Sequence, residues 1–408
     1  MINYKLSFIE SPSEIEIILN SSKSESNRLL IIKSLSDNKI ELENLSNAND
    51  TVLLKNLIRS NSQNIWDAED AGTTMRFLTS FLAVTKQGVL LIGTERMKKR
   101  PIKILVDALN KIGAEISYTG KDGYPPIKIN RKISQIKNSI SIRGDISSQY
   151  ISSLLMIAPV LPNGLKIDVM PPFYSKPYVM MTLNLMKKFG IKYDLSEDSI
   201  SINNQEYKSG SYKVESDWSA ASYWYSFISI NKKLKEIKLK GLREHSFQGD
   251  QIIKKIMTLF NVETLYDKDG IILRKKDFDC DYLELDFKDC PDLAQTVLVV
   301  AAFHKVKLKL YGVESLKIKE TDRLEAMSNE LKKIGVNFYD DNGVWTLDKR
   351  NDEFSSEASI ETYKDHRMAM AFAPLASEIN ITINNPDVVN KSYPTFWKDM
   401  KKAGYDII

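Results

Sequence analysis

Two cations, Lys319 and Arg323, flank the carboxylate of Glu320 within five positions of the chain. Asp322 followed by Glu325 predicts that a helix begins here, with Asp322 as its cap and Arg323 in its first turn. A helix start offers free backbone N–H groups and a positive dipole end, so it favours bound anions. A carboxylate held among cations, as Glu320 would be, is a common arrangement for proton transfer. Taken alone, the stretch fits a solvated, salt-bridged helix start better, because most charge clusters at protein surfaces are solvated.

Polar residues also gather at the starts of helices that are apolar nearly all round. A helix without a polar face is expected to be buried. Six segments have this character: Ser26–Leu35, Gly72–Val84, Ser147–Val160, Asp217–Ile230, Asp292–His304 and Asp365–Ala376. Ser, Asp and Thr at their starts fit plain helix caps. Capping does not explain the cations Lys23, Arg28, Arg76 and Arg367, because cations oppose the dipole at that end. They predict converging sites for phosphate or carboxylate groups.

A second kind of helix, amphipathic and stopped by Gly or Asn, recurs along the chain. The stops lie at positions 113, 190, 261, 335 and 404, and Val52–Asn61 is a weaker first copy. Strand-like segments lie between the helices: Val89–Ile92, Ile127–Ile129, Ile140–Arg143, Leu165–Val169, Ile237–Lys240, Lys307–Leu310 and Ile379–Ile383. The pattern predicts six units, each with one buried and one surface helix, and therefore three units in each of two domains.

Composition excludes several classes of protein. Net charge is 57 − 53 = +4 over 408 residues, without the dense basic tract of a nucleic-acid binder. Two cysteines, Cys280 and Cys290, form no disulfide framework or zinc pattern. The most apolar run, Val297–Phe303, is too short to cross a bilayer, and the first twenty residues carry no signal-type core. We expect a soluble cytoplasmic protein.

Seven blocks along the chain resemble one known family. They are Ser22-Lys23-Ser24-x-Ser26-Asn27-Arg28, Ala71-Gly72-Thr73-Thr74-Met75-Arg76, Arg96-Met97-Lys98-Lys99-Arg100-Pro101-Ile102, Ser147-Ser148-Gln149, Ser175-Lys176-Pro177-Tyr178, Lys319-Glu320-Thr321-Asp322-Arg323 and Asp365-His366-Arg367-Met368-Ala369-Met370. In order and spacing they are similar to the 3-phosphoshikimate 1-carboxyvinyltransferases, also called EPSP synthases. The resemblance runs the full length of the chain. Single blocks are weak, but the Arg-Met-Lys, Lys-Glu-Thr-Asp-Arg and Asp-His-Arg-Met-Ala-Met blocks together are highly specific.

The resemblance implies an α/β fold, the two-domain inside-out α/β barrel of the enolpyruvyl transferases. Each domain would hold three βαβαββ units around buried parallel helices whose N-termini face an interdomain cleft, the site of the reaction. With crossings near Leu19–Ser22 and Tyr207–Val214, we expect one domain at 21–213 and the other at 1–20 plus 214–408.

The family's activity is transfer of the enolpyruvyl group of phosphoenolpyruvate to the 5-hydroxyl of shikimate 3-phosphate, in the shikimate pathway that leads to chorismate and the aromatic amino acids. The reaction runs by addition to a tetrahedral intermediate and elimination of phosphate, without metal, cofactor or covalent enzyme intermediate. By resemblance, phosphoenolpyruvate is held by Lys23, Gly72, Arg96, Gln149, Arg323, Arg367 and Lys391. Shikimate 3-phosphate is held by Lys23, Ser24, Arg28, Ser147, Ser148, Gln149, Ser175, Asp292, Ser315 and Lys319. Asp292 is implied as the general base on the hydroxyl, and Glu320 with Lys23 as the group that moves the proton of the methylene carbon. Gly72 suits such a place, since a side chain there would occupy ligand space.

This sequence departs from the family pattern at four positions. Asp70 stands where Asn is frequent, Phe77 where Pro is frequent, Ser315 where Asn is frequent, and Ser21 where Gly is usual. These departures bear on ligand affinity and inhibitor response more than on reaction type. Outside the blocks, Trp218, Tyr223 and Trp224 fit core packing, Asp217 fits a cap or hinge, and His366 fits a structural histidine beside the site.

Two other functions stay open at this point. The sister enzymes that transfer enolpyruvyl to UDP-N-acetylglucosamine usually carry a Cys in a mobile loop of the first domain, and the corresponding Thr94–Pro101 has none. A non-catalytic anion binder or a nucleic-acid binder is suggested only by the pI of about 8.6. Intact Asp292 and Glu320 argue against the first, and the missing basic tract argues against the second. We expect a monomer whose partners are the two small substrates, with no nucleic-acid or membrane partner.

Overall fold

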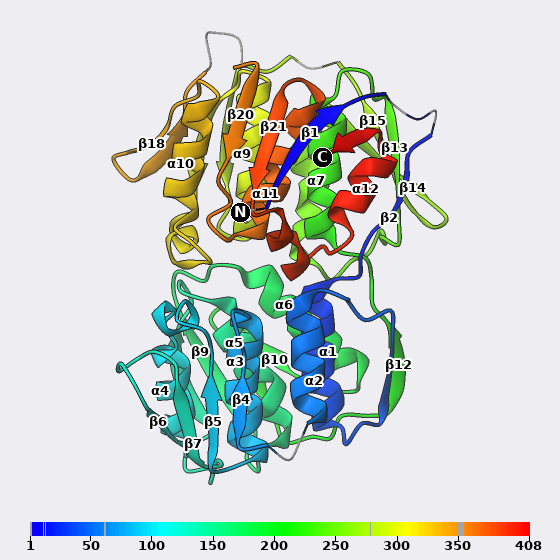
Figure 1. Cartoon of the computed structure of the whole chain (residues 1–408). Coiled ribbons are helices and arrows are strands. Elements are labelled where there is room, and N and C mark those ends of the chain that lie inside the picture. The colour runs from blue at the N-terminus through cyan, green and yellow to red at the C-terminus, as the bar shows by residue number, and fades with distance from the viewer. Residues whose placement is uncertain (1, 11, 13, 61–62, 278, 350–354) are drawn as a thin grey trace. The chain divides into compact units, whose positions relative to one another are not determined.

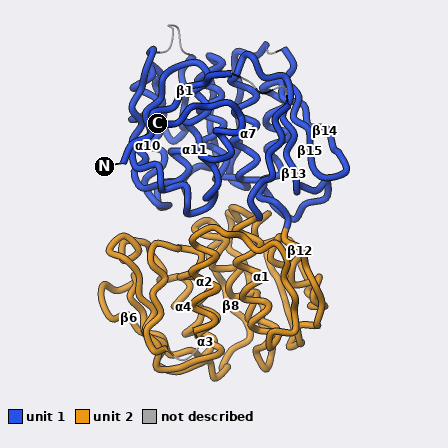
Figure 2. The backbone as a smooth tube through the Cα atoms, turned by 45° about the vertical axis from the view of Figure 1, so that its right-hand side comes forward, with its two compact units in different colours: residues 1–21, 215–408 blue, residues 22–214 orange. Residues whose placement is uncertain are grey.

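The computed structural model describes residues 2–10, 12, 14–60, 63–277, 279–349 and 355–408. The chain forms two compact units, with residues 1–21 and 215–408 in unit 1 and residues 22–214 in unit 2 (Figure 2). Where the chain passes between the units, Ser21 forms an antiparallel bridge with Ser216. The backbone N–H of Asp217 donates to the carbonyl of Asn20 at 2.8 Å, so the two crossing segments are held together.

Unit 2 alternates helices and short strands (Figure 1). Its elements are α1 (Lys23–Leu35), β3 (Ile40–Glu43), α2 (Asn49–Arg59), β4 (Ile65–Asp67), α3 (Gly72–Thr85), β5 (Val89–Ile92), η1 (Met97–Lys99), α4 (Lys103–Ile112), β6 (Glu115–Tyr118), β7 (Ile127–Arg131), β8 (Ser139–Arg143), α5 (Ser148–Ile157), η2 (Ala158–Val160), β9 (Leu165–Met170), α6 (Lys176–Lys188), β10 (Asp194–Leu195), β11 (Ser199–Ile202) and β12 (Gly210–Lys213), where η marks a 3₁₀ helix.

Unit 1 takes its first two strands from the start of the chain. Its elements are β1 (Asn3–Phe8), β2 (Glu16–Ile18), α7 (Trp218–Ile230), β13 (Glu236–Lys240), η3 (Gly249–Ile252), α8 (Ile253–Thr258), β14 (Val262–Asp267), β15 (Gly270–Lys275), β16 (Tyr282–Asp286), η4 (Pro291–Leu293), α9 (Ala294–Phe303), β17 (Lys307–Tyr311), η5 (Glu314–Ile318), α10 (Arg323–Lys333), β18 (Phe338–Asp341), β19 (Val344–Leu347), β20 (Glu357–Ile360), α11 (His366–Phe372), η6 (Ala373–Ser377), β21 (Asn380–Asn384), η7 (Pro386–Lys391), α12 (Phe396–Lys402) and β22 (Tyr405–Ile407).

The sheets repeat one pattern. Among the described residues, five sheets have four strands, in the orders β4-β5-β7-β6, β10-β11-β9-β8, β14-β15-β13-β2, β16-β17-β19-β18 and β20-β21-β1-β22. Each joins one parallel pair, such as β16 with β17, to two antiparallel pairings. In four of these sheets a crossover helix links the parallel pair, as parallel strands require, whereas β2 and β13 are separated in sequence by all of unit 2 and by α7. The remaining sheet in the described part of the chain has two parallel strands, β12 and β3.

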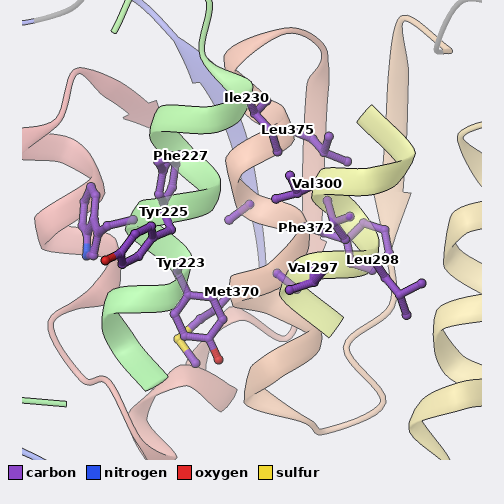
Figure 3. Close-up of a cluster of buried hydrophobic side chains, with 14 of the residues drawn as sticks. Tyr223, Tyr225, Phe227, Ile230, Val297, Leu298, Val300, Met370, Phe372 and Leu375 are labelled. Carbon is purple, nitrogen blue, oxygen red and sulfur yellow. The ribbon is translucent and has the colours of Figure 1, made fainter. Parts of the chain in front are cut away.

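The apolar helices lie inside the units, as their sequences predict. In unit 1, α7, α9 and α11 pack against one another, and Figure 3 shows Tyr223, Val297 and Met370 from these helices among the buried side chains. In unit 2, α1, α3 and α5 pack together in the same way. Two of the six helices end earlier than expected. After α5 and after α11 the chain tightens into a 3₁₀ turn that contains Pro159 or Pro374, because proline lacks the N–H that would continue an α-helix.

The amphipathic helices end where their sequences predict. Gly113, Gly190, Asn261, Gly335 and Gly404 all have positive φ angles, between 53° and 112°. At Gly113 a side chain is excluded twice, because φ is 112° and an added Cβ would lie 2.0 Å from the carbonyl oxygen of Ser134.

None of the helices in the described ranges is both long enough and apolar enough to cross a membrane.

Candidate active site

The guanidinium of Arg323 is the centre of a charged cluster in unit 1. Asp322 caps α10 by accepting from the backbone N–H groups of Leu324 and Glu325, so Arg323 opens the helix as its sequence predicts. Its Nε donates to Asp365 at 2.7 Å, Nη1 to Asp292 at 2.9 Å and Nη2 to Glu320 at 2.8 Å.

Arg323 is only 2% exposed, which rules out a solvated surface salt bridge. Burial alone would lower the pKa of Arg323, but the three carboxylates outweigh burial and raise it above the usual value. The guanidinium is therefore held permanently charged inside the unit.

Asp292 bridges two arginines. Its Oδ1 accepts from Arg323, and its Oδ2 accepts from Nη2 of Arg367 at 2.9 Å. Burial acts to raise the pKa of Asp292, but Arg367, Lys319 and Arg323 outweigh it and hold the pKa well below the usual range. Asp292 is thus ionised, with both oxygens engaged, in the arrangement the structure describes.

Glu320 is the second carboxylate with cations on both sides. Oε2 accepts from Arg323, and Oε1 lies 3.5 Å from Nζ of Lys391 at the end of η7. Its side chain is 12% exposed. Lys319 precedes it at the end of η5, and Ser315 lies buried within that turn. The structure therefore gathers Asp292, Glu320, Arg323, Arg367 and Lys391 into one cluster.

Arg28 is one of the predicted substrate-binding residues that lie in unit 2, and it is 2% exposed. Nε donates to Thr182 at 2.7 Å, Nη1 to the carbonyl of Ser24 at 2.9 Å, and Nη2 to Ser152 at 3.4 Å and to the carbonyl of Tyr178 at 3.2 Å. These contacts use four of its five N–H groups. Burial lowers the pKa of Arg28 to about 10, so it is still a cation at neutral pH. Arg28 therefore ties α1 to α5 and α6 as well as supplying charge.

Lys23 opens α1, where its ammonium pairs with Asp50 at 3.4 Å. Asp50 lies at the start of α2 and is buried, so the two helix starts are joined by charge. Asp50 is absent from the residues that the sequence singled out.

Gln149 and Gly72 come together through Arg76. Nη1 of Arg76 donates to Oε1 of Gln149 at 2.8 Å. A Cβ added to Gly72 would lie 2.7 Å from Nη1 of Arg76 and 2.6 Å from Nη1 of Arg100. The expected ligand space at Gly72 is therefore bordered by two guanidinium groups, neither of which the resemblance put in the binding set.

The remaining predicted residues of unit 2 lie at helix starts or in the adjoining loop. Ser147 caps α5 by accepting from the N–H of Gln149 at 3.3 Å, and Ser148 is the first residue of that helix. Ser175 precedes α6 with a left-handed φ of 56°, an uncommon backbone for serine that is often found at functional sites. Arg96 leads into η1, in the segment that also carries Arg100.

Three further residues at the unit 1 cluster were not predicted to belong to it. Asp365, which its sequence position predicts as a helix cap, is fully buried. It caps α11 by accepting from the backbone N–H of Arg367, and it also accepts a hydrogen bond from Nε of Arg323. Tyr223 packs in the core as expected, but its hydroxyl also lies 3.2 Å from Nη1 of Arg367. Ser219 lies 3.4 Å from the same guanidinium. In the sequence, the only sign that these three residues belong to the cluster is that they lie near the start of a buried helix. Many other residues share that position, so it could not single them out.

Comparison with known proteins places this arrangement in a family. The family model described as EPSP synthase (3-phosphoshikimate 1-carboxyvinyltransferase) matches residues 54–400. A 3-phosphoshikimate 1-carboxyvinyltransferase of Bacteroides fragilis (strain YCH46) is 45% identical over 405 residues, 98% of either chain. The chain belongs to the EPSP synthase family. A relative in that family from Buchnera aphidicola (subspecies Baizongia pistaciae) is 36% identical over 417 residues, covering 94% of this chain and 95% of that one.

Solved structures support the expected enolpyruvyl transferase fold. An EPSP synthase structure from Acinetobacter baumannii superposes with a TM-score of 0.78 at 19% identity, covering 100% of this chain and 99% of the other. An enolpyruvyl transferase structure from Streptomyces tendae gives 0.73 at 11% identity, over 100% and 98% of the two chains. The α/β fold predicted from the sequence is thereby confirmed.

The structure shows what surrounds three of the residues at which this sequence departs from the EPSP synthase pattern. The hydroxyl of Thr94 donates to Asp70, which supplies one partner for the added charge. Phe77 is fully buried, and the guanidinium of Arg28 lies 5.4 Å from its ring centroid, a cation–π distance. Ser21 forms the backbone bridge at the crossing between the units.

Proposed function

We propose that this protein transfers the enolpyruvyl group of phosphoenolpyruvate to the 5-hydroxyl of shikimate 3-phosphate, as the family name describes. The observation that carries the proposal is the cluster around Arg323, where two half-buried carboxylates, Asp292 and Glu320, lie among cations in a member of this family. The two carboxylates share Arg323 but have different second cations, Arg367 for Asp292 and Lys391 for Glu320. Two carboxylates in different surroundings suit a reaction with proton transfers at two different atoms.

Phosphoenolpyruvate is a small molecule with a carboxylate and a phosphate. We assign its carboxylate to Arg323 and Arg367, whose forked guanidinium groups match carboxylate geometry. Lys391 completes this side of the site. Lys23, Gly72, Arg96 and Gln149 serve the rest of the molecule from unit 2, where the backbone N–H of Gly72 at the start of α3 suits an anion.

Binding of that carboxylate changes Asp292. In the ligand-free arrangement Asp292 shares Arg323 and Arg367, and a carboxylate with a lowered pKa is a weak base. A ligand carboxylate that takes over the two guanidinium groups frees one oxygen of Asp292 and raises its pKa. Asp292 then becomes a competent base for the 5-hydroxyl when the second substrate is present.

The reaction balances as an addition, which forms one C–O bond and moves two protons, followed by an elimination, which breaks the C–O bond to phosphate and moves one proton. The 5-hydroxyl oxygen attacks carbon 2 of phosphoenolpyruvate, its proton goes to Asp292, and carbon 3 gains a proton to become a methyl group. In the elimination, the methyl group returns a proton and phosphate leaves with the C–O bond electrons. We assign the proton on carbon 3 to Glu320, together with Lys23.

Shikimate 3-phosphate would bind mainly to polar residues at or near the starts of helices. We assign it to Lys23, Ser24, Arg28, Ser147, Ser148, Gln149, Ser175, Asp292, Ser315 and Lys319. The serine hydroxyls are donors for the phosphate. Arg28 has one N–H group beyond its protein contacts, so its contribution is mainly its charge and its support of Ser24.

Steady-state phosphate release tests the proposal. We expect release when shikimate 3-phosphate and phosphoenolpyruvate are supplied together, and none with either alone. Release with UDP-N-acetylglucosamine and phosphoenolpyruvate, but not with shikimate 3-phosphate, would assign the sister reaction instead. The monomeric state and the cytoplasmic location stay predictions, the first open to size-exclusion chromatography with light scattering.

A further inference from the structure

Arg76 links three parts of unit 2 that carry proposed ligand-binding residues. From α3 its Nη1 donates to Oε1 of Gln149 on α5 at 2.8 Å. Its guanidinium lies over the ring of Tyr150, 5.5 Å from the centroid. The hydroxyl of Tyr150 donates in turn to the carbonyl of Pro101 at 2.5 Å, at the end of the segment that carries Arg96. Arg76 is 7% exposed, so these contacts are made largely out of water.

The amide of Gln149 is fixed at both of its ends. Its oxygen accepts from the Arg76 guanidinium, and its Nε2 donates to Oγ1 of Thr73 at 2.9 Å. A side-chain amide has a carbonyl oxygen and two N–H donors, and a half-turn exchanges them. Here that half-turn would set N–H groups against the N–H groups of Arg76. The cation therefore decides which way the amide faces and leaves its second N–H for a ligand.

We propose that Arg76 is a positioning residue that holds Gln149 as a hydrogen-bond donor toward the anionic substrates. The inference rests on the proposed function, in which Gln149 contacts both phosphoenolpyruvate and shikimate 3-phosphate. A free glutamine offers an acceptor as readily as a donor, and an acceptor facing a carboxylate or phosphate repels it. Arg76 removes that alternative. Direct binding of an anion by Arg76 is the competing role, since Gly72 lies close to its Nη1.

A double-mutant cycle separates the two roles. KM and kcat for both substrates are measured in the wild type, Arg76→Met, Gln149→Ala and the double variant. We expect Arg76→Met to raise KM by about tenfold or more, the scale of a hydrogen bond to a charged group, while kcat changes much less. In the Gln149→Ala background, Arg76→Met should have almost no further effect, because its target is gone.

Two variants serve as controls. Arg131→Met removes an exposed arginine of β7 in the same unit and should leave both constants unchanged. Thr73→Val keeps the side-chain volume but removes the acceptor at the other end of the amide. It should raise KM in the same direction as Arg76→Met, and it supplies the test if Arg76→Met lowers the melting temperature strongly.

The outcomes are distinct. Effects of Arg76→Met and Gln149→Ala that multiply would assign Arg76 an anion contact of its own and overturn the positioning role. Unchanged KM in both Arg76→Met and Thr73→Val would overturn it as well. Absence of turnover in the wild type would instead be a failure of the proposed function, and the two failures are therefore told apart in one experiment.

Discussion

Replacing Arg323 by Met should destabilise unit 1 strongly. The substitution keeps a long side chain but leaves three carboxylates without their shared cation. Asp365 is fully buried, so its charge has the least access to water. Breaking a buried ion pair by removing one partner costs about 3–5 kcal/mol. In a unit of roughly 200 residues, each kcal/mol shifts the melting temperature by about 2–4 °C, so we expect a fall of about 6–20 °C.

Differential scanning calorimetry at pH 7 measures the fall. Arg274→Met is the matched control in the same unit, because Arg274 also pairs with a carboxylate, Glu236 at 3.0 Å, but is 49% exposed. An exposed pair contributes at most about 1 kcal/mol, and the control should melt within a few degrees of the wild type. Combining Arg323→Met with Asp365→Asn should recover part of the loss, since it removes a buried charge.

Equal melting temperatures for Arg323→Met and Arg274→Met would refute the predicted destabilisation. That result would mean that Arg323 is hydrated in solution and that its three ion pairs do not hold the helix starts together. A double variant that melts below Arg323→Met would also contradict the argument, because it would show that the Asp365 charge is not the source of the cost.

Three further predictions concern other parts of the molecule. Glu320→Gln should lower kcat by about a hundredfold or more while KM stays within a few-fold, because the amide keeps the shape and loses the proton; loss of substrate binding in calorimetry would show a structural role. Gly72→Ala should raise KM for phosphoenolpyruvate by about tenfold with an unchanged melting temperature, because the new methyl group displaces the guanidinium groups of Arg76 and Arg100; unchanged KM would refute this. Burial first, and then the charge of nearby Lys275, lowers the pKa of His304 to about 4, so the unfolded chain takes up a proton below pH 6.5 and the folded chain does not. Stability should therefore fall by about 2 kcal/mol between pH 7 and pH 5, and His304→Gln should remove most of that fall in urea titrations; an equal fall in both proteins would contradict it.

Local chemistry predicted the parts of the fold that depend on neighbours in sequence. Asp322 caps α10 because a carboxylate at that place satisfies free N–H groups, whatever the rest of the chain does. The apolar helices are buried because they have no continuous polar face, and Gly113 ends α4 because the next turn needs a left-handed residue.

The side-chain pairs that hydrogen-bond within the candidate site could not be predicted in the same way. Arg323 and Asp365 are 42 positions apart, and Arg76 and Gln149 are 73 apart. Such contacts depend on how the buried helices stack, which periodicity does not encode. Tyr223 illustrates the limit, because its ring obeys the core pattern while its hydroxyl reaches Arg367. Family resemblance predicted a set of ligand-binding residues, but not the contacts that Asp50, Arg76 and Asp365 make with members of that set.

The central claim is enolpyruvyl transfer between two particular substrates, and a single-turnover experiment tests it most directly. Enzyme in excess over phosphoenolpyruvate is mixed with shikimate 3-phosphate and quenched at intervals, and phosphate and the enolpyruvyl ether are quantified by NMR. We predict that the two products appear together, one for one, and that omission of shikimate 3-phosphate abolishes both. Phosphate released without shikimate 3-phosphate, or without formation of the ether, would contradict the account.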